Sequence, residues 1–226
     1  MEELFDKAES YDEMLNQGLS VTGEDKDFYA EARLHHMQKN LPESFQPTRI
    51  LDFGCGIGET TILLSKIYPN ATVWGFDTSV ETIMFARKRY GSDNRKFHSI
   101  ASLKDHNDFD LAYVNGVFHH IPVNERADSA CSIYLALRKG GKLAFFENNP
   151  WNPGTHWVMS RIPFDRDAVK LSYLEAKSLC QKAGFSTVDT IRFLFYFPAS
   201  LKFLRPVEPL FESVPFGGQY LVLVSK

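Results

Sequence analysis

The fold of this chain is decided by Ile50-Leu51-Asp52-Phe53-Gly54-Cys55-Gly56-Ile57-Gly58, an apolar run that ends in an acid and leads into three alternating glycines. A segment with helix-forming character begins directly afterwards at Glu59. The pattern predicts a strand, a tight turn and the first turn of a helix. Glycines at alternate positions let the backbone bend sharply and leave room for a ligand against main-chain atoms.

A second predicted strand, residues 71–77, also ends in an acid, Asp77. Asp77 lies about twenty residues after the glycines, where a nucleotide-binding βαβ unit presents a carboxylate to ribose hydroxyls. A carboxylate accepts strong hydrogen bonds from such a diol. The pattern therefore favours ribose binding by Asp77, with Thr78 beside it, over the alternative that Asp77 only caps the next helix.

Two further segments complete the pattern. A predicted strand over residues 109–115 ends at Asn115 and leads into Gly116-Val117-Phe118-His119-His120-Ile121-Pro122. The turn Arg138-Lys139-Gly140-Gly141 then leads into a predicted strand over residues 142–148. With the G-x-G-x-G turn and Asp77, these segments span residues 49–148. In order and spacing they resemble the class I S-adenosylmethionine-dependent methyltransferases of the small-molecule type, such as those of ubiquinone and menaquinone biosynthesis. The spacing is not the G-x-G-x-x-G of dehydrogenases, which argues against that class.

The resemblance implies an α/β, Rossmann-like, doubly wound fold. Its sheet has seven mostly parallel strands with an antiparallel last strand, and a helical cap precedes it. We expect a single methyltransferase domain over residues 1–226, with the cap over 1–45 and the donor-binding core over 49–148. An acceptor-side loop over 149–171 and a lid over 198–216 complete it.

The alternation of strand and helix signals independently predicts a parallel sheet. Helices are predicted at 24–41, 59–68, 79–90 and 123–138, and strands at 49–53, 72–77, 95–100, 109–115 and 142–148. Ser172 and Glu175 form a capping-box pattern that opens a helix ending at Gly184. Residues 185–197 and 219–225 are predicted as a final antiparallel pair.

The resemblance also implies S-adenosyl-L-methionine as methyl donor, with the glycine turn holding its methionine part. Asp52 either binds the donor's amino group or caps the turn. Arg33 shares a helix face with Tyr29 and either pairs with the donor's carboxylate or is solvated. Where relatives carry an acid for adenine, this chain has Ala101, so Ser102 is the candidate. The expected donor contacts are Tyr11, Arg33, Asp52, Gly54, Cys55, Gly56, Gly58, Asp77, Thr78, Ser102 and Asn115.

Candidate catalytic residues are His119, His120 and Glu147. Imidazole titrates near neutral pH and suits proton removal from an acceptor, although the histidine pair has a structural alternative in bonding the loop backbone. Glu147 ends the fifth strand, at the edge where such sheets hold ligands. Asp165 near Arg161 belongs either to an anion site or to a surface ion-pair cluster. The three cysteines show no metal-ligand spacing, and we expect no metal site.

Composition and charge limit the classes of partner that this protein is expected to bind. The chain has 226 residues and a net charge of −3, without the basic patch of a nucleic-acid surface. Its first residues lack a signal-peptide pattern, and its longest apolar run is too short for a membrane span, so we expect a cytoplasmic protein. The aromatic stretch over 198–216 leaves three roles open: a lid, a peripheral membrane contact or a dimer contact. The expected state is a monomer or a homodimer.

The sequence thus predicts methyl transfer to a small-molecule acceptor, with oxygen favoured as the methylated atom and a lipid- or sugar-derived biosynthetic intermediate as the acceptor. An RNA or protein methyltransferase is the alternative within the fold. Asn115-Gly116-Val117-Phe118 stands where an Asn-Pro-Pro-Tyr-type motif would be. A donor-binding module without turnover is the alternative of another class.

Overall fold

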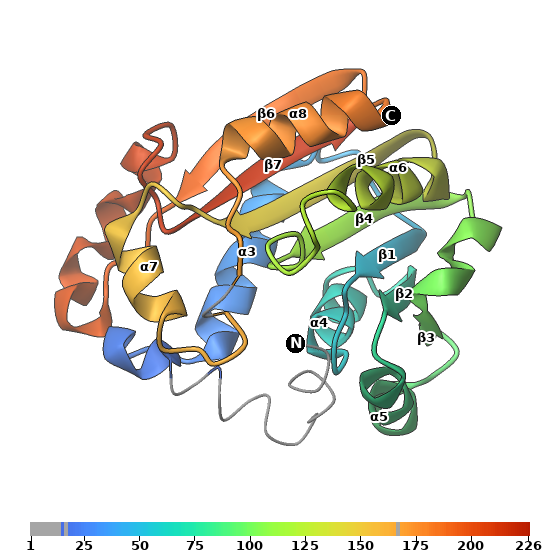
Figure 1. Ribbon diagram of the computed structural model, residues 1–226, viewed down its shortest axis with the longest axis horizontal. Coiled ribbons are helices and arrows are strands. Elements are labelled where there is room, and N and C mark those ends of the chain that lie inside the picture. The colour runs from blue at the N-terminus through green and yellow to red at the C-terminus, as the bar shows by residue number, and fades with distance from the viewer. Residues whose placement is uncertain (1–14, 16–17, 166–167) are drawn as a thin grey trace.

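The computed structural model describes residue 15 and residues 18–165 and 168–226. The predicted donor contact Tyr11 lies outside these residues. Seven strands form one sheet in the order β3-β2-β1-β4-β5-β7-β6 (Figure 1). Strands β1 to β5 are parallel, and β7 runs antiparallel to both β5 and β6, which confirms the predicted fold class. The strands are β1 (Arg49–Phe53), β2 (Thr72–Asp77), β3 (Arg95–Ser99), β4 (Phe109–Asn115), β5 (Leu137–Asn148), β6 (Thr187–Leu194) and β7 (Gln219–Ser225).

Helices connect the strands and cover both faces of the sheet, with α6 and α8 on the near face in Figure 1. They are α3 (Lys26–Asn40), α4 (Glu59–Ile67), α5 (Val80–Tyr90), α6 (Arg126–Ala136), α7 (Pro153–Met159) and α8 (Tyr173–Ala183). Three 3-10 segments complete the described chain: η1 (Ser20–Thr22), η2 (Ile100–Asp105) and η3 (Ala199–Phe211). None of the described helices combines the length and apolar character that a membrane crossing requires.

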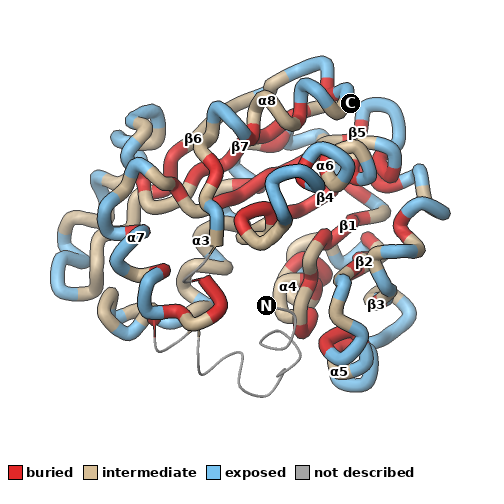
Figure 2. Tube along the Cα trace, in the orientation of Figure 1, coloured by how far each residue is buried: buried red, intermediate tan, exposed pale blue. Residues whose placement is uncertain are grey.

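The period-two alternation of strand side chains divides the core between the two faces of the sheet. Leu51 of β1 belongs to the same buried cluster as Ile133 of α6 and Cys180 of α8. Its neighbour Ile50 points the other way and belongs to a second cluster with Leu34 of α3 and Leu64 of α4. Figure 2 shows the buried residues running along the central strands. Because both faces are covered, ligands reach the sheet at the strand ends.

Local sequence signals explain where the helices start and stop. Asp25 accepts a hydrogen bond from the Phe28 amide at 2.9 Å, and Ser79 accepts one from the Thr82 amide at 3.2 Å, so both act as N-caps. The predicted capping box of α8 is present, and Gly184 ends that helix with a φ of +115°.

The structure differs from the sequence prediction at several element ends. Strand β5 begins at Leu137 instead of residue 142, because Leu137 pairs with Phe109 of β4 across an irregularity in the register. Helix α6 accordingly ends at Ala136. The position of α3 against the sheet is set by its buried face: Leu34 and Met37 are its buried side chains, and they face the sheet.

Candidate functional site

A cavity of about 1170 Å³ opens at the carboxyl ends of β1, β2 and β4. It is larger than the roughly 300–1,000 Å³ of a single-ligand pocket, so it has room for a donor and an acceptor together. One wall comes from the strand ends and is formed by Gly54, Gly56, Asp77, Thr78, Thr82, Ile100 and Asn115. The opposite wall comes from α7 with its N-cap, the segment after it and the residues that follow β6, and is formed by Asn152, Gly154, Thr155, Trp157, Val158, Met159, Ile162, Phe164, Phe195, Tyr196, Phe197 and Pro198.

The three glycines of the turn serve two different structural roles. All have positive φ angles, of 73°, 52° and 90° at Gly54, Gly56 and Gly58. A Cβ at Gly54 would lie 2.4 Å from Val117, and one at Gly58 would lie 2.7 Å from Phe97. A Cβ at Gly56 would meet nothing within 4 Å. Gly54 and Gly58 therefore allow close packing, whereas Gly56 keeps open the space in which a ligand fits.

Asp77 bonds to two backbone amides, and the next helix, α5, is capped by Ser79 and not by Asp77. One carboxylate oxygen accepts a hydrogen bond from the Gly56 amide at 2.8 Å, and the other accepts one from the Ser79 amide at 3.0 Å. Asp77 also lines the cavity together with Thr78. The carboxylate therefore fixes the glycine turn, and a ligand in the cavity would meet it there.

Four predicted donor contacts do not line the cavity: Gly58, which packs against Phe97, and Asp52, Cys55 and Ser102. Asp52 is buried and accepts a hydrogen bond from the Thr61 hydroxyl at 2.7 Å, and burial raises its pKa to about 7. Cys55 is buried inside the turn, where burial holds the pKa of its thiol well above the usual range. The Ser102 hydroxyl donates a hydrogen bond to the Ser99 carbonyl. In this segment Ile100 lines the cavity and Ser102 does not. The direct roles predicted for Asp52 and Ser102 do not fit these positions.

Arg33 and Asn115, two of the predicted donor contacts, line the cavity, and each carries a buried polar atom without a hydrogen-bond partner among the described residues. Arg33 donates from Nη1 to Gln219 at 3.2 Å, but its buried Nε has no hydrogen-bond partner among the described residues. The same holds for the buried Oδ1 of Asn115. Because buried polar atoms are normally paired, these two atoms fit a site that a polar ligand completes.

The sequence did not single out Gln219. Its Oε1 accepts from Arg33 and, at 3.1 Å, from the Tyr196 hydroxyl, while its Nε2 donates to Asn148 at 3.0 Å. Gln219 begins β7 and contacts α3 across 186 residues of sequence. Only the antiparallel placement of β7 brings these groups together, so no local pattern could have indicated it.

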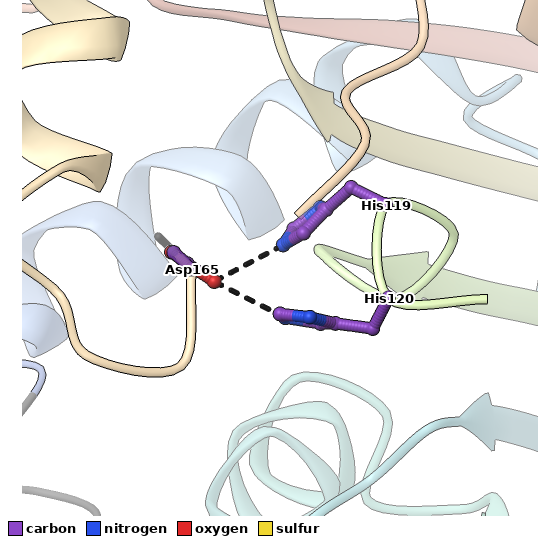
Figure 3. A group of neighbouring side chains, drawn as sticks. All are labelled: His119, His120 and Asp165. Carbon is purple, nitrogen blue, oxygen red and sulfur yellow. Dashed lines mark hydrogen bonds and ion pairs between the residues drawn. The ribbon is translucent and has the colours of Figure 1, made fainter. Parts of the chain in front are cut away.

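His119 lies between two carboxylates. Its Nδ1 is 2.6 Å from Glu147 Oε2, and its Nε2 is 3.2 Å from Asp165 Oδ1. His120 Nε2 lies 3.1 Å from the same Asp165 oxygen, so both rings converge on it (Figure 3). Burial alone would lower the pKa of His119, but Glu147 and Asp165 raise it to about 10. Burial alone would raise the pKa of Asp165, but its bonds to both histidines lower it to about 2.

This geometry changes the predicted catalytic roles. Neither ring nitrogen of His119 is open to take a proton from an acceptor, so the general-base role does not fit it. Glu147 is fully buried, accepts a hydrogen bond from the Phe118 amide at 2.7 Å and lies behind His119, outside the cavity wall. It therefore positions His119. His120 lines the cavity and stays a candidate for contact with the acceptor.

Backbone contacts explain how Asp165 reaches the histidines. The Val169 amide donates to the His119 carbonyl at 3.1 Å. The buried Arg126 guanidinium donates to the carbonyl of Ile121, at 3.1 Å, and to that of Val169. Asp165 is therefore neither part of an anion site nor in a surface cluster, and its side chain is buried against the loop that follows β4.

Comparison with known proteins agrees with this geometry. Residues 50–141 match a family model described as a methyltransferase domain. A trans-aconitate 2-methyltransferase from Methylobacterium nodulans is 30% identical over 143 residues, which cover 63% of this chain and 55% of that protein. The chain spans about half the length of the curated relatives that it matches.

Residues 50–141 of this chain thus carry a methyltransferase domain. Solved structures share its fold. A SAM-dependent methyltransferase from Archaeoglobus fulgidus has a TM-score of 0.67 and 17% identity, covering 92% of this chain and 97% of that one. A methyltransferase from Mesorhizobium loti has a TM-score of 0.62 and 20% identity, covering 86% and 98%.

The matched methyltransferase domain holds the glycine turn, Asp77, Asn115 and both histidines, but not every part of the site. Arg33 precedes it, and Asp165 and Gln219 follow it. The donor side of the cavity thus lies within the matched domain, whereas the opposite wall and the carboxylate that joins the two histidines come from later segments.

Proposed function

We propose that this protein transfers a methyl group from S-adenosylmethionine to an oxygen atom of a small, largely apolar acceptor. The observation that carries the donor assignment is the open space at Gly56, with the Asp77 carboxylate held beside it by the Gly56 amide at 2.8 Å. The unpaired Arg33 Nε and Asn115 Oδ1 support a polar, charged ligand in the same cavity.

The far wall of the cavity supports an acceptor with little charge. Among the described residues that line the cavity, Lys26 and Arg33 are the only lysine or arginine. Both side chains already have partners in the protein. The Lys26 ammonium lies 2.5 Å from both carboxylate oxygens of Glu59, and Arg33 donates a hydrogen bond to Gln219. A tricarboxylate such as the trans-aconitate named for the relatives would need more cations than these. The aromatic and aliphatic side chains of the wall favour an apolar biosynthetic intermediate, such as a lipid-derived one.

The chemistry asks little of the protein beyond alignment. When bound, the donor supplies a methyl group on a positively charged sulfur. The methyl group would pass to the acceptor oxygen as the carbon–sulfur bond breaks, the acceptor's hydroxyl proton would pass to water, and S-adenosylhomocysteine would remain. The residues of this chain hold the two reactants in line and exclude water, and these effects account for much of such a rate enhancement.

Titration calorimetry tests the donor assignment first. We expect S-adenosylmethionine and S-adenosylhomocysteine to bind the purified chain and NAD not to bind. Incubation with candidate acceptors should then give products heavier by one methyl group, detected by mass spectrometry. Binding of NAD alone, or of neither adenosyl ligand, would contradict the proposal. Donor binding without any methylated product across acceptor classes would favour the module without turnover, and methylated RNA or protein would favour the macromolecular alternative.

A further inference from the structure

We propose that His119, His120 and Asp165 form a binding site for one divalent transition-metal ion, with Zn²⁺ as the fitting ion. The three side chains converge on one point of the cavity wall (Figure 3). Each offers one ligand atom, and these atoms all lie within 4.8 Å of one another. Two imidazoles and one carboxylate are a donor set that binds Zn²⁺ and other first-row ions.

The distances fit an ion between the groups. The His119 and His120 Nε2 atoms lie 3.2 and 3.1 Å from Asp165 Oδ1. Zinc bonds of about 2.0–2.2 Å at tetrahedral angles place neighbouring ligand atoms roughly 3.4 Å apart. The two nitrogen–oxygen distances would therefore change by only a few tenths of an ångström on binding an ion, and the two histidine ligand atoms lie within 4.8 Å of each other.

Glu147 supplies the support that metal-binding histidines commonly have. It lies 2.6 Å from His119 Nδ1, which fixes the ring and directs Nε2 toward Asp165. A carboxylate on the far nitrogen of a histidine orients the ring and raises its basicity as a ligand. The Phe118 amide in turn fixes Glu147 at 2.7 Å, so the supporting group is itself held in place.

Charge balance gives an independent reason for a cation. Glu147 and Asp165 are two carboxylates with side chains only 0% and 7% exposed. Buried charges need a compensating charge, and with two neutral imidazoles one divalent ion balances both carboxylates. Two protons on the histidine pair would balance them equally, so the experiment must distinguish an ion from two protons.

The position of the site indicates its use, and this step rests on the proposed function. All three ligands line the cavity, and three protein ligands with an open fourth position are typical of catalytic zinc sites. An acceptor hydroxyl at that position would have its pKa lowered by the ion and release its proton to water. Its oxygen would then attack the methyl carbon as the carbon–sulfur bond breaks. No oxidant or reductant is needed, which suits a redox-inactive ion.

The test is a Zn²⁺ titration of the full chain, freed of metal by a chelator and carrying no histidine tag, with a chromophoric indicator as competitor. We expect one Zn²⁺ per chain, and Co²⁺ should give a visible absorption band at the same stoichiometry. His120→Gln and Asp165→Asn should weaken binding by about 100-fold or more, and Glu147→Gln by about 10–100-fold. The matched control is His35→Gln, an exposed histidine of α3 that should change nothing.

Two results would overturn the site: no stoichiometric Zn²⁺ binding by the wild-type chain, or equal affinity in the wild type, His120→Gln and Asp165→Asn. The cluster would then be held by the hydrogen bonds and ion pairs among its own side chains. Calorimetry with S-adenosylhomocysteine on the same samples confirms that each variant is folded. It also separates the two proposals, because a chain that binds Zn²⁺ but no adenosyl ligand keeps the metal site and loses the proposed function.

Discussion

Gly56 and Gly140 form a matched pair for testing the donor site. Both have positive φ angles, of 52° and 76°, and a Cβ at either would meet nothing within 4 Å. Of these two glycines, only Gly56 lines the cavity. A leucine at either position costs about 1–2 kcal/mol of stability, because a side chain is strained at such a φ. We expect Gly56→Leu to lose adenosyl-ligand binding in calorimetry, whereas Gly140→Leu keeps it. Equal affinities in the two variants would contradict our assignment of the glycine turn.

Asp77 can be tested through the ribose hydroxyls that it is expected to bind. Replacing Asp77 with Ala should weaken S-adenosylhomocysteine binding by about 1.5–3 kcal/mol, the cost of lost charged hydrogen bonds. Part of that loss would come from the freed Gly56 and Ser79 amides. An S-adenosylhomocysteine analogue without ribose hydroxyls isolates the direct part, because the variant should lose less affinity for the analogue than it loses for S-adenosylhomocysteine. An equal loss with both ligands would make Asp77 purely structural.

Asp52 predicts a pH dependence of stability. Its pKa in the folded chain is about 7, above the usual 3.8, because burial disfavours the charged form. The folded chain therefore holds the proton between these values, and the free energy of unfolding falls as the pH rises from about 4 to about 7. At about 1.4 kcal/mol for each pKa unit, the loss reaches up to about 4 kcal/mol.

Asp52→Asn should remove this loss, since the amide oxygen still accepts from Thr61 and never ionises. Urea unfolding at pH 5 and pH 8 measures this effect. The free energy of unfolding of the variant, relative to that of the wild type, should be higher at pH 8 than at pH 5. The exposed Asp93→Asn is the control and should show no such gain. A constant difference between Asp52→Asn and the wild type at both pH values would show that Asp52 keeps its usual pKa.

At the residue scale, the sequence could indicate a position at the cavity where a strand end decides it. Gly54, Gly56, Asp77 and Asn115 line the cavity at the ends of strands, and their roles in donor binding stay predictions. Sequence reasoning failed where a side chain meets its partner through tertiary contact. Glu147 and Asp165 lie 28 and 46 residues from His119, and no local spacing reports such a pair.

At the scale of elements, helix α8 offers a test that its sequence already suggested. The Ser172 hydroxyl accepts from the Glu175 amide at 3.3 Å, and Glu175 Oε2 accepts from the Ser172 amide at 2.7 Å. Ser172→Ala should lower the free energy of unfolding by about 1 kcal/mol, the usual cost of a lost N-cap. Donor affinity should not change, because α8 does not line the cavity. A variant as stable as the wild type in urea would mean that the capping box contributes nothing.

Element types followed from the sequence more reliably than element ends. Each predicted strand and helix has a counterpart, because alternating apolar residues and capping signals are local properties. The start of β5 at Leu137 depends instead on pairing with Phe109 of the neighbouring strand. The predicted lid over 198–216 stays a prediction. Pro198 lines the cavity, whereas Arg205 of η3 pairs with Glu24 just before α3, and Glu212 just after η3 pairs with Lys39 of α3.

At the scale of the whole molecule, the cavity joins parts that are far apart in the chain. Arg33 of α3, Asp77 of β2, Trp157 of α7 and Gln219 of β7 all line it. A ligand that contacts several of these elements binds only the folded chain, so it must stabilise the whole molecule. At a hundred times its dissociation constant the gain is about 2.7 kcal/mol.

For a chain of this size we therefore expect S-adenosylhomocysteine to raise the melting temperature by about 5–10 °C. The shift should grow with the logarithm of ligand concentration, as mass action requires, and NAD should give none. Gly56→Leu should melt somewhat below the wild type and show no shift, while Gly140→Leu should melt equally low and keep the shift. Differential scanning calorimetry of the wild type, Gly56→Leu and Gly140→Leu, each with and without ligand, measures these melting temperatures. A shift retained by Gly56→Leu would place the adenosyl ligand elsewhere, because the leucine would then occupy space that the ligand does not use.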